Sequence, residues 1–382
     1  MALKFNVLEI KQFRAIRQLK IDGLGRVNLL TGRNNTGKSS VLEAIRLLAS
    51  EGSPSVIYDI LRSREEDMGE TGESTPPLDA DGLFQLSSLF PGFPRFSAKL
   101  APIVIAATGG SHPMNLSLQP DWVTEERQPD GSRKLIPQPL HPSDEQKIVP
   151  ALVQEIVPAL IIATSNKGQI VLLELMQRYA YSRRTLRSEI DEQPIPCLFV
   201  SPYGGERTTA LGPLWDKIAL SDNEKDVVAA LRIIDPEISG VSMVGGAGSR
   251  PTRTAIVRAA GISRPVPLRS FGDGVNRLFG IILSLVNAKG GLLLIDEFEN
   301  GLHHTVQADA WRIIFKLAVD LDIQVVATSH SWDAIEAFQQ AASEVPEEGV
   351  LIRLSRRGQD IIPTLFSKDE MAVVTLDHIE VR

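Results

Sequence analysis

A glycine-rich segment near the N-terminus has the residue types and spacing of a phosphate-binding loop. Residues 32–39 read Gly-Arg-Asn-Asn-Thr-Gly-Lys-Ser, which fits the pattern G-x-x-x-x-G-K-S in full. In such a loop, successive backbone N–H groups surround a phosphate chain, and the glycines allow the chain to turn tightly enough. A helix starting near Gly37 would point its positive end at the same anion. We therefore expect ATP to be bound through its phosphates by Arg33, Asn34, Asn35, Thr36, Gly37, Lys38, Ser39 and Ser40.

Two carboxylates follow an aliphatic run later in the chain and complement this loop. Residues 292–297 read Leu-Leu-Leu-Ile-Asp-Glu, which places Asp296 and Glu297 at the carboxyl end of a buried strand. We expect Lys38 to reach the β- and γ-phosphates. The Ser39 hydroxyl and Asp296 are the expected ligands of Mg²⁺. A carboxylate within reach of the γ-phosphate can polarise the attacking water, and this catalytic role is assigned to Glu297.

Two further segments are candidates for contact with the triphosphate. Residues 324–330, Gln-Val-Val-Ala-Thr-Ser-His, read as a strand that ends in a polar pair, so His330 is expected to hydrogen-bond the γ-phosphate. Residues 270–274, Ser-Phe-Gly-Asp-Gly, precede a helical pattern, and small residues at a helix start form a second anion site. Because this segment lies far from the phosphate-binding loop in sequence, it is expected to serve a different nucleotide.

Strands and helices must alternate to position these residues. Apolar runs predict strands over residues 5–10, 19–21, 27–31, 291–296 and 323–328, whereas helical spacing predicts helices over 39–48, 275–288 and 306–317 and from Trp332 onward. Strands that are apolar throughout and alternate with helices indicate a parallel sheet covered on both faces. Residues 51–96 read as an exposed loop region, and the middle section adds a strand over 114–118 and helices near 171–190 and 223–233.

Composition limits the class of protein. The 382 residues carry a net charge of −7, so a nucleic-acid surface would have to be a local basic patch such as Arg250, Arg253, Arg258 and Arg264, or Arg183, Arg184 and Arg187. Solvated arginines on a helix or loop face are the alternative interpretation of both groups. Cys197 is the single cysteine, which excludes an internal disulfide. The sequence shows no leader and no membrane-spanning run, which predicts a cytoplasmic protein without membrane contact and excludes a membrane-spanning transporter subunit.

The order of these motifs resembles that of the ABC ATPase superfamily, and it is most similar to the soluble RecF/SMC-like branch and to OLD-type AAA-family ATPases. The segments that carry the resemblance are residues 10–14, 32–39, 268–274, 295–303 and 327–333. The implied fold is an α/β P-loop NTPase of the ABC-ATPase head type, with a mixed or parallel sheet flanked by helices. Residues 1–50 and 265–382 would form this core. Residues 51–264 would be an inserted loop region and a helical/β lobe, mainly helical, between the phosphate-binding loop and the signature.

The resemblance also implies a dimer with two ATP molecules held between the subunits, or a higher even-numbered homo-oligomer. In that arrangement the signature residues Ser270, Gly272, Asp273 and Gly274 contact the γ-phosphate bound by the partner, and Glu299, Asn300 and Gly301 form the D-loop at the interface. The signature departs from the usual Ser-Gly-Gly-Gln, which puts its detailed contacts in doubt. The glutamine of the Q-loop cannot be placed.

These features predict Mg²⁺-dependent ATP hydrolysis that controls a separate effector, a nuclease or another toxin, in prokaryotic anti-phage defence. OLD-type proteins often carry a C-terminal Toprim nuclease, but only 52 residues follow His330 and they lack its D-x-D pair. A DNA-repair or chromosome-maintenance ATPase of RecF/SMC type that acts directly on DNA is the main alternative. DNA or RNA is a possible partner, through the basic stretches named above. A non-catalytic scaffold that uses ATP only as a structural element is a third, and Glu297 and His330 argue against it.

Overall fold

A six-stranded sheet carries the phosphate-binding loop and both polar strand ends. In this computed structural model, which describes residues 2–64, 84–94, 100–111, 113–128, 133–137, 156–172, 194–202, 208–245, 253–345 and 349–376, the strand order is β16-β15-β3-β14-β13-β9. The strands are β3 (Val27–Thr31), β9 (Cys197–Val200), β13 (Leu292–Ile295), β14 (Gln324–Thr328), β15 (Gly349–Arg357) and β16 (Asp360–Phe366). Neighbours from β15 to β9 are parallel, and β16 runs antiparallel to β15.

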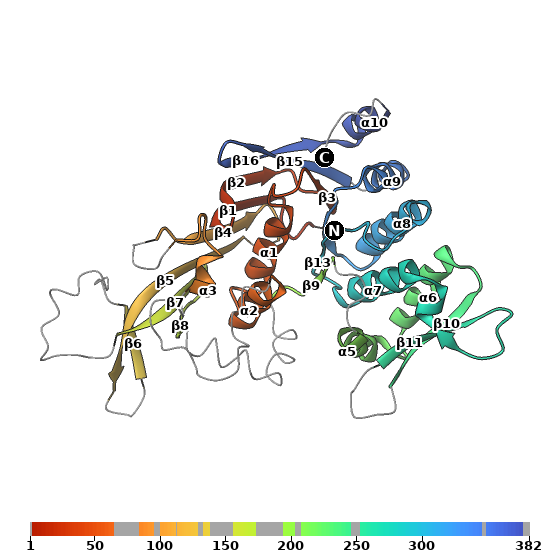
Figure 1. The fold of residues 1–382 in the computed structure, drawn as a ribbon, viewed down its shortest axis with the longest axis horizontal. Helices are drawn as coiled ribbons and strands as arrows, with labels where there is room; N and C mark the ends of the chain where they lie inside the picture. The colour runs from red at the N-terminus through yellow and green to blue at the C-terminus, as the bar shows by residue number, and fades with distance from the viewer. Residues whose placement is uncertain are drawn as a thin grey trace, which may run out of the picture.

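Two hydrophobic cores lie on opposite faces of this sheet. Successive residues of a strand point to opposite faces, and in β13 Leu293 and Ile295 belong to one core, whereas Leu292 and Leu294 belong to the other. The first core contains α7 (Asp273–Asn287), α8 (His304–Asp320) and α9 (Trp332–Ser343), and the second contains α1 (Lys38–Ala49). Figure 1 shows these helices flanking the strands. The predicted α/β fold with a helix-covered parallel sheet is confirmed.

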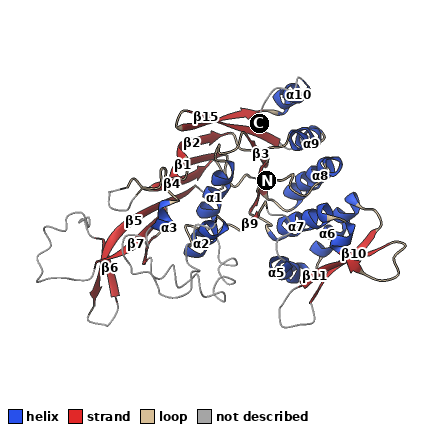
Figure 2. Ribbon diagram, viewed as in Figure 1, coloured by secondary structure: helices blue, strands red, loops and turns tan. Residues whose placement is uncertain are grey.

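A second, seven-stranded sheet adjoins the core and extends away from it (Figure 2). Its order is β2-β1-β4-β5-β7-β8, with β6 paired to β5, and all its pairs are antiparallel. The strands are β1 (Val7–Phe13), β2 (Ile16–Asp22), β4 (Ile103–Thr108), β5 (Met114–Arg127), β6 (Arg133–Pro137), β7 (Ile156–Thr164) and β8 (Gly168–Leu172). The core side chains of α1 pack against β1 and β4, so this sheet also supports the phosphate-binding loop.

The remaining elements form a smaller unit beside α7. Its three-stranded sheet has the order β10-β11-β12, and α5 (Thr208–Ile218) and α6 (Asp222–Ile234) pack against it. The strands are β10 (Ile238–Gly245), β11 (Arg253–Ala259) and β12 (Val266–Pro267). The 3₁₀ helix η6 (Leu268–Phe271) leads from β12 into α7, and α10 (Lys368–Leu376) follows β16.

Residues 51–264 differ from expectation in two places. The predicted loop over residues 51–96 contains α2 (Pro54–Ser63) and the short α3 (Phe84–Ser87), because Ile57 and Ile60 sit on one helix face and are buried. The helix predicted near residues 171–190 begins inside β8, and its residues 173–190 lie outside the described part of the chain.

The described part of residues 51–264 is also richer in strand than the mainly helical lobe that we expected. It supplies β4 to β8 to the antiparallel sheet and β9 to the central sheet. We retain residues 1–50 and 265–382 as the proposed ATPase core, with β9 as a strand added to it from the intervening region.

Candidate functional site

The phosphate-binding loop joins the end of β3 to the start of α1. Gly32, with φ 137°, Asn35, with φ 62°, and Gly37, with φ 88°, adopt positive φ, a region that side chains other than glycine rarely enter. A Cβ at Gly32 would lie 2.3 Å from the carbonyl oxygen of Leu354, so only glycine fits between the loop and β15. The loop therefore turns as its sequence pattern predicts and leaves its N–H groups at the start of α1.

The Lys38 ammonium is folded back onto this loop. Its Nζ donates to the carbonyl oxygens of Gly32 at 2.6 Å and Arg33 at 3.0 Å. Burial lowers the pKa of Lys38, and the carboxylates of Asp296, Glu299 and Glu297 act against that shift. Negative charge nearby thus favours the charged form of this lysine at the position where a phosphate oxygen would accept a hydrogen bond.

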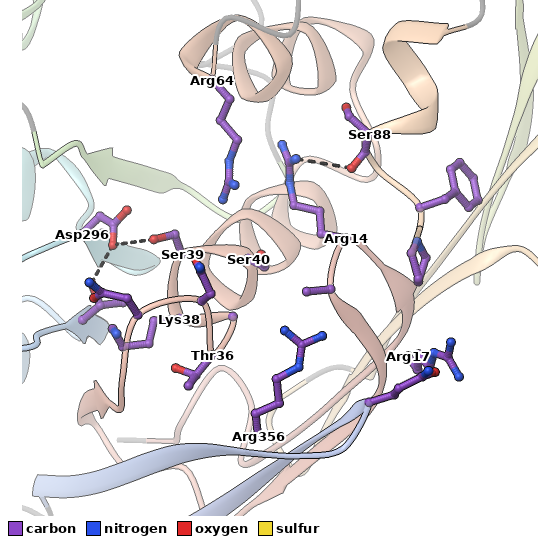
Figure 3. A pocket seen from close by; sticks show the side chains of 18 of the residues that line it. Arg14, Arg17, Thr36, Lys38, Ser39, Ser40, Arg64, Ser88, Asp296 and Arg356 are labelled. Atoms are coloured by element: carbon purple, nitrogen blue, oxygen red, sulfur yellow. Dashed lines mark hydrogen bonds between the residues drawn. The ribbon is translucent and has the colours of Figure 1, made fainter. Parts of the chain in front are cut away.

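Ser39, Asp296 and Thr328 form one hydrogen-bonded cluster at the carboxyl ends of β13 and β14. Asp296 Oδ1 accepts from Ser39 Oγ at 3.1 Å and from Thr328 Oγ1 at 2.6 Å (Figure 3). Asp296 is 6% exposed and Thr328 is fully buried. The first helical turn after the loop and the acidic strand end, more than 250 residues apart in sequence, therefore meet at one oxygen-rich point.

Glu297 occupies a constrained turn after β13. Its φ is 47°, its backbone N–H donates to Thr328 Oγ1 at 2.9 Å, and its Oε2 accepts from Asn300 Nδ2 at 3.0 Å. The buried Arg277 guanidinium donates to the carbonyl oxygens of Asp296 at 3.1 Å and Glu297 at 3.4 Å, and also to that of Ser201. These bonds fix the turn so that the Glu297 carboxylate faces the same pocket as Lys38.

His330 follows β14 and is held by Glu299. The Glu299 Oε1 atom accepts from the His330 backbone N–H at 2.9 Å and lies 3.0 Å from His330 Nδ1. A hydrogen bond from Nδ1 leaves Nε2 free to interact with another group. His330 also lines the pocket, so Glu299, which was predicted to belong to the D-loop, holds the histidine that was predicted to contact the γ-phosphate.

The signature residues lie outside this pocket. Ser270 is in η6, Gly272 has φ 105° at the start of α7, and both are exposed together with Asp273. A Cβ at Gly274 would be 3.0 Å from the carbonyl oxygen of Gly301, so the signature helix start packs beside the D-loop turn. The chain brings these two predicted groups together but does not direct the signature toward its own phosphate-binding loop.

One cavity of about 910 Å³ collects most of the predicted site. Its lining includes residues 34–40 as well as Asp296, Glu297 and His330. Arg33 was also predicted to bind the phosphates, but it is exposed and does not line the cavity. Its carbonyl oxygen accepts hydrogen bonds from Lys38 and Thr36. The cavity also contains residues to which the sequence assigned no role: Arg14, Ala15, Arg17, Arg64, Ser88, Phe90, Pro91, Gly92, Phe93, Thr328, Arg356 and Gln359. Only Arg14 and Thr328 lie in segments that the motif comparison had singled out.

Among the weaker candidates, Arg253 and His303 have structural roles, whereas Arg258 and Arg264 are exposed. Arg253 donates to Asp216 Oδ1 at 2.5 Å, so part of the first basic stretch is paired, while Arg183, Arg184, Arg187 and Arg250 lie outside the described residues. His303 caps the start of α8 through Thr305. The described part of the chain holds no group of three or more His, Cys, Asp or Glu side chains that could bind a metal. No helix within it is long and apolar enough to cross a membrane.

Two parts of the chain match families of ATPase domains. Residues 3–79 match the family described as an AAA ATPase domain, and residues 208–335 match an AAA domain family whose description links it to the AbiEii toxin of type IV toxin–antitoxin systems. An ATP/GTP phosphatase of Helicobacter pylori (strain ATCC 700392 / 26695) is 23% identical over 392 residues, covering 94% of both proteins.

Two further similarities are more limited. The uncharacterized protein MJECL11 of Methanocaldococcus jannaschii is 30% identical over 96 residues, which cover 25% of this chain and 84% of that protein. A solved SMC head, bound to the C-winged helix domain of ScpA, aligns with a TM-score of 0.47 at 12% identity over 95% of this chain and 97% of that one.

Proposed function

Because the chain is a P-loop ATPase with AAA-family sequence over residues 3–79 and 208–335, we propose that it acts as a Mg²⁺-dependent switch. ATP binding closes a nucleotide-sandwiched dimer, and hydrolysis opens it. The change is passed to a separate effector, a nuclease or another toxin, in prokaryotic anti-phage defence.

The ATPase site is supported above all by the hydrogen-bonded cluster of Ser39, Asp296 and Thr328 beside Lys38. A triphosphate needs positive charge and backbone donors on one side and a carboxylate that readies water on the other. The loop residues 34–40 supply the first, and Glu297, which lines the same cavity, supplies the second.

The donor set of this cluster fits Mg²⁺. Mg²⁺ prefers oxygen ligands and is commonly held by one or two carboxylates together with substrate phosphates. A hydroxyl and a carboxylate oxygen 3.1 Å apart, in Ser39 and Asp296, provide such a set on the protein side. When bound, the ion would neutralise charge on the β- and γ-phosphates.

The chain's own residues supply the remaining steps. Lys38 exchanges the two loop carbonyls for phosphate oxygens, since a charged donor gains more from an anionic acceptor than from a neutral one. Glu297 accepts a proton from the attacking water, and Asn300 holds one of its carboxylate oxygens in place. His330, oriented by Glu299, donates to the γ-phosphate through Nε2.

The exposed signature loop supports the dimer. Gly272 and Asp273 stand at the N-terminal end of the 15-residue helix α7, where backbone N–H groups attract an anion, but they are exposed and do not line the pocket of their own subunit. A second subunit packed head to tail would bring this helix start onto the γ-phosphate. The adjacent Gly301 turn would lie at the same interface.

The test combines hydrolysis with light scattering. We expect Lys38→Ala to abolish ATP turnover, because the main cation at the triphosphate is lost. Glu297→Gln should retain ATP and trap the dimer, because it preserves the Asn300 contact but cannot take a proton. Wild-type turnover in Lys38→Ala would reject the site, and a monomer for Glu297→Gln with ATP and Mg²⁺ would reject the sandwich.

The switch and the direct DNA ATPase differ in their response to DNA. The net charge of −7 and the pairing of Arg253 with Asp216 favour the switch. We expect duplex DNA to leave the rate of hydrolysis unchanged, whereas clear stimulation would favour the alternative. Plating of phage on cells that carry the gene with its neighbours, as wild type and as Lys38→Ala, tests the defence role: equal plating would contradict it.

A further inference from the structure

The cavity extends well beyond the residues that surround the phosphates. In Figure 3, Ser39 and Asp296 lie at one end, and Arg14, Arg17 and Arg356 lie toward the other. At that end the lining continues with Ser88 and residues 90–93 of the loop that follows α3. None of the residues to which a role was assigned above lies in this half of the cavity.

One aromatic side chain of this loop is buried and the other is exposed. Phe90 is 3% exposed and belongs to the core on the α1 face of the central sheet, whereas Phe93 is 64% exposed and lines the cavity. Gly92 and Phe93 itself both have positive φ, 77° and 52°. Phe90 therefore anchors the loop, and the two positive φ values turn the second ring outward at the mouth of the pocket.

Hydrogen bonds to the β1–β2 turn hold this loop in place. The Arg14 backbone N–H donates to the Leu89 carbonyl oxygen at 2.7 Å, and Arg14 Nη1 donates to that of Ser88 at 3.4 Å. The Arg14 guanidinium also contacts the buried carboxylate of Glu43 in α1. The loop that carries Phe93 is thus connected through Arg14 to the helix that begins at the phosphate-binding loop.

We propose that this end of the cavity is a nucleoside subsite in which the Phe93 ring stacks on the base of the bound nucleotide. The proposal rests on the triphosphate site assigned above. A base has a flat π-face, and stacking on an aromatic side chain depends little on which base it is. Phe93 offers such a face, at the rim of a cavity whose volume of about 910 Å³ is large enough for a whole nucleotide.

The polar groups around Phe93 favour purines. Arg17 and Arg356 are exposed at the same end, and a guanidinium group only donates hydrogen bonds. Adenine and guanine both present N7 as an acceptor, and guanine adds O6 as a second one. The subsite therefore takes both purine nucleotides, because stacking depends little on the base, and an arginine contact binds GTP at least as tightly as ATP.

Equilibrium binding of ATP, GTP and inorganic tripolyphosphate to the full chain tests this assignment. Tripolyphosphate carries the phosphate chain without a base. Phe93→Ala should weaken ATP and GTP by about 5-fold or more, at the lower end of the range for loss of base–aromatic stacking. Its affinity for tripolyphosphate should stay at the wild-type value, and Phe93→Trp should restore nucleotide binding. Leu220→Ala, which truncates a side chain 98% exposed and outside the cavity, is the matched control.

Three results would overturn the subsite. One is unchanged ATP and GTP affinity in Phe93→Ala. Another is an equal loss for tripolyphosphate, which would mean that the substitution disturbs the phosphate site. Tighter binding of ATP than of GTP by the wild type would reject the arginine contact to the base. Failure of the ATPase site itself is recognised separately, because Lys38→Ala would then leave tripolyphosphate binding intact.

Discussion

The hydroxyl of Thr328 connects both strand ends of the site, so its removal without a change of shape is the sharpest perturbation available. Thr328→Val keeps the volume and β-branching of the side chain. It deletes the donor to Asp296 Oδ1 at 2.6 Å and the acceptor of the Glu297 N–H at 2.9 Å. Because Thr328 is fully buried, water cannot replace either bond.

The expected cost follows from these two contacts. Asp296 Oδ1 keeps its bond from Ser39, whereas the Glu297 N–H loses its acceptor, and a buried polar group left without its partner costs about 1–3 kcal/mol. We therefore expect Thr328→Val to lower the free energy of unfolding by about 1–3 kcal/mol. A residue that orients a metal-binding carboxylate typically affects metal affinity by about 10- to 100-fold. The Mg²⁺ concentration that half-saturates ATP hydrolysis should therefore rise by about that factor.

Thr328→Ser is the matched control, because it keeps both hydrogen bonds and loses one methyl group, worth about 1 kcal/mol. Thermal unfolding without nucleotide gives the stability difference, and hydrolysis at a series of Mg²⁺ concentrations gives the half-saturation value. If the valine and serine variants show the same Mg²⁺ dependence, Thr328 does not orient Asp296 and the reasoning fails.

Two further predictions concern the phosphate-binding loop and its lysine. Gly32→Ala should abolish ATP binding, because the new Cβ would lie 2.3 Å from the Leu354 carbonyl oxygen. The control is Gly290→Ala, where φ is 76° and no atom lies within 4 Å of the new Cβ. It should cost only backbone strain of about 1 kcal/mol. Equal effects in calorimetry and nucleotide binding would contradict the close packing of the loop on β15. Glu299→Gln should lower the pKa of Lys38 further, because it removes a charge that raises it. The ammonium is then lost at lower pH, so the alkaline limb of the pH dependence of ATP affinity should move to lower pH; an unmoved or raised limb would count against this coupling.

Local sequence determined the phosphate-binding loop and three of the six strands of the central sheet, β3, β13 and β14. The loop needs only consecutive residues, since its own N–H groups bind the anion, and residues 32–39 therefore identify it without any distant partner. The strand over residues 27–31 was predicted with its observed bounds, and β14, Gln324–Thr328, was predicted to begin one residue earlier. Both could be recognised because buried parallel strands are apolar throughout. The helices after them follow from apolar spacing alone.

Only the tertiary structure decided which distant residues complete the site. Thr328 and Asp296 are 32 residues apart and are brought together by the pairing of β13 with β14, whereas Arg14 and Ser88 are 74 apart and meet where the loop after α3 packs on the β1–β2 turn. Strand order is set by packing of whole elements, and it leaves no periodic signal in the chain. For the same reason the sequence placed β9 in an inserted lobe and did not assign Phe93. A hydrogen bond or a pocket wall made by residues far apart depends on the path of the chain in space, whereas a loop, a helix or a buried strand depends chiefly on its neighbours in sequence.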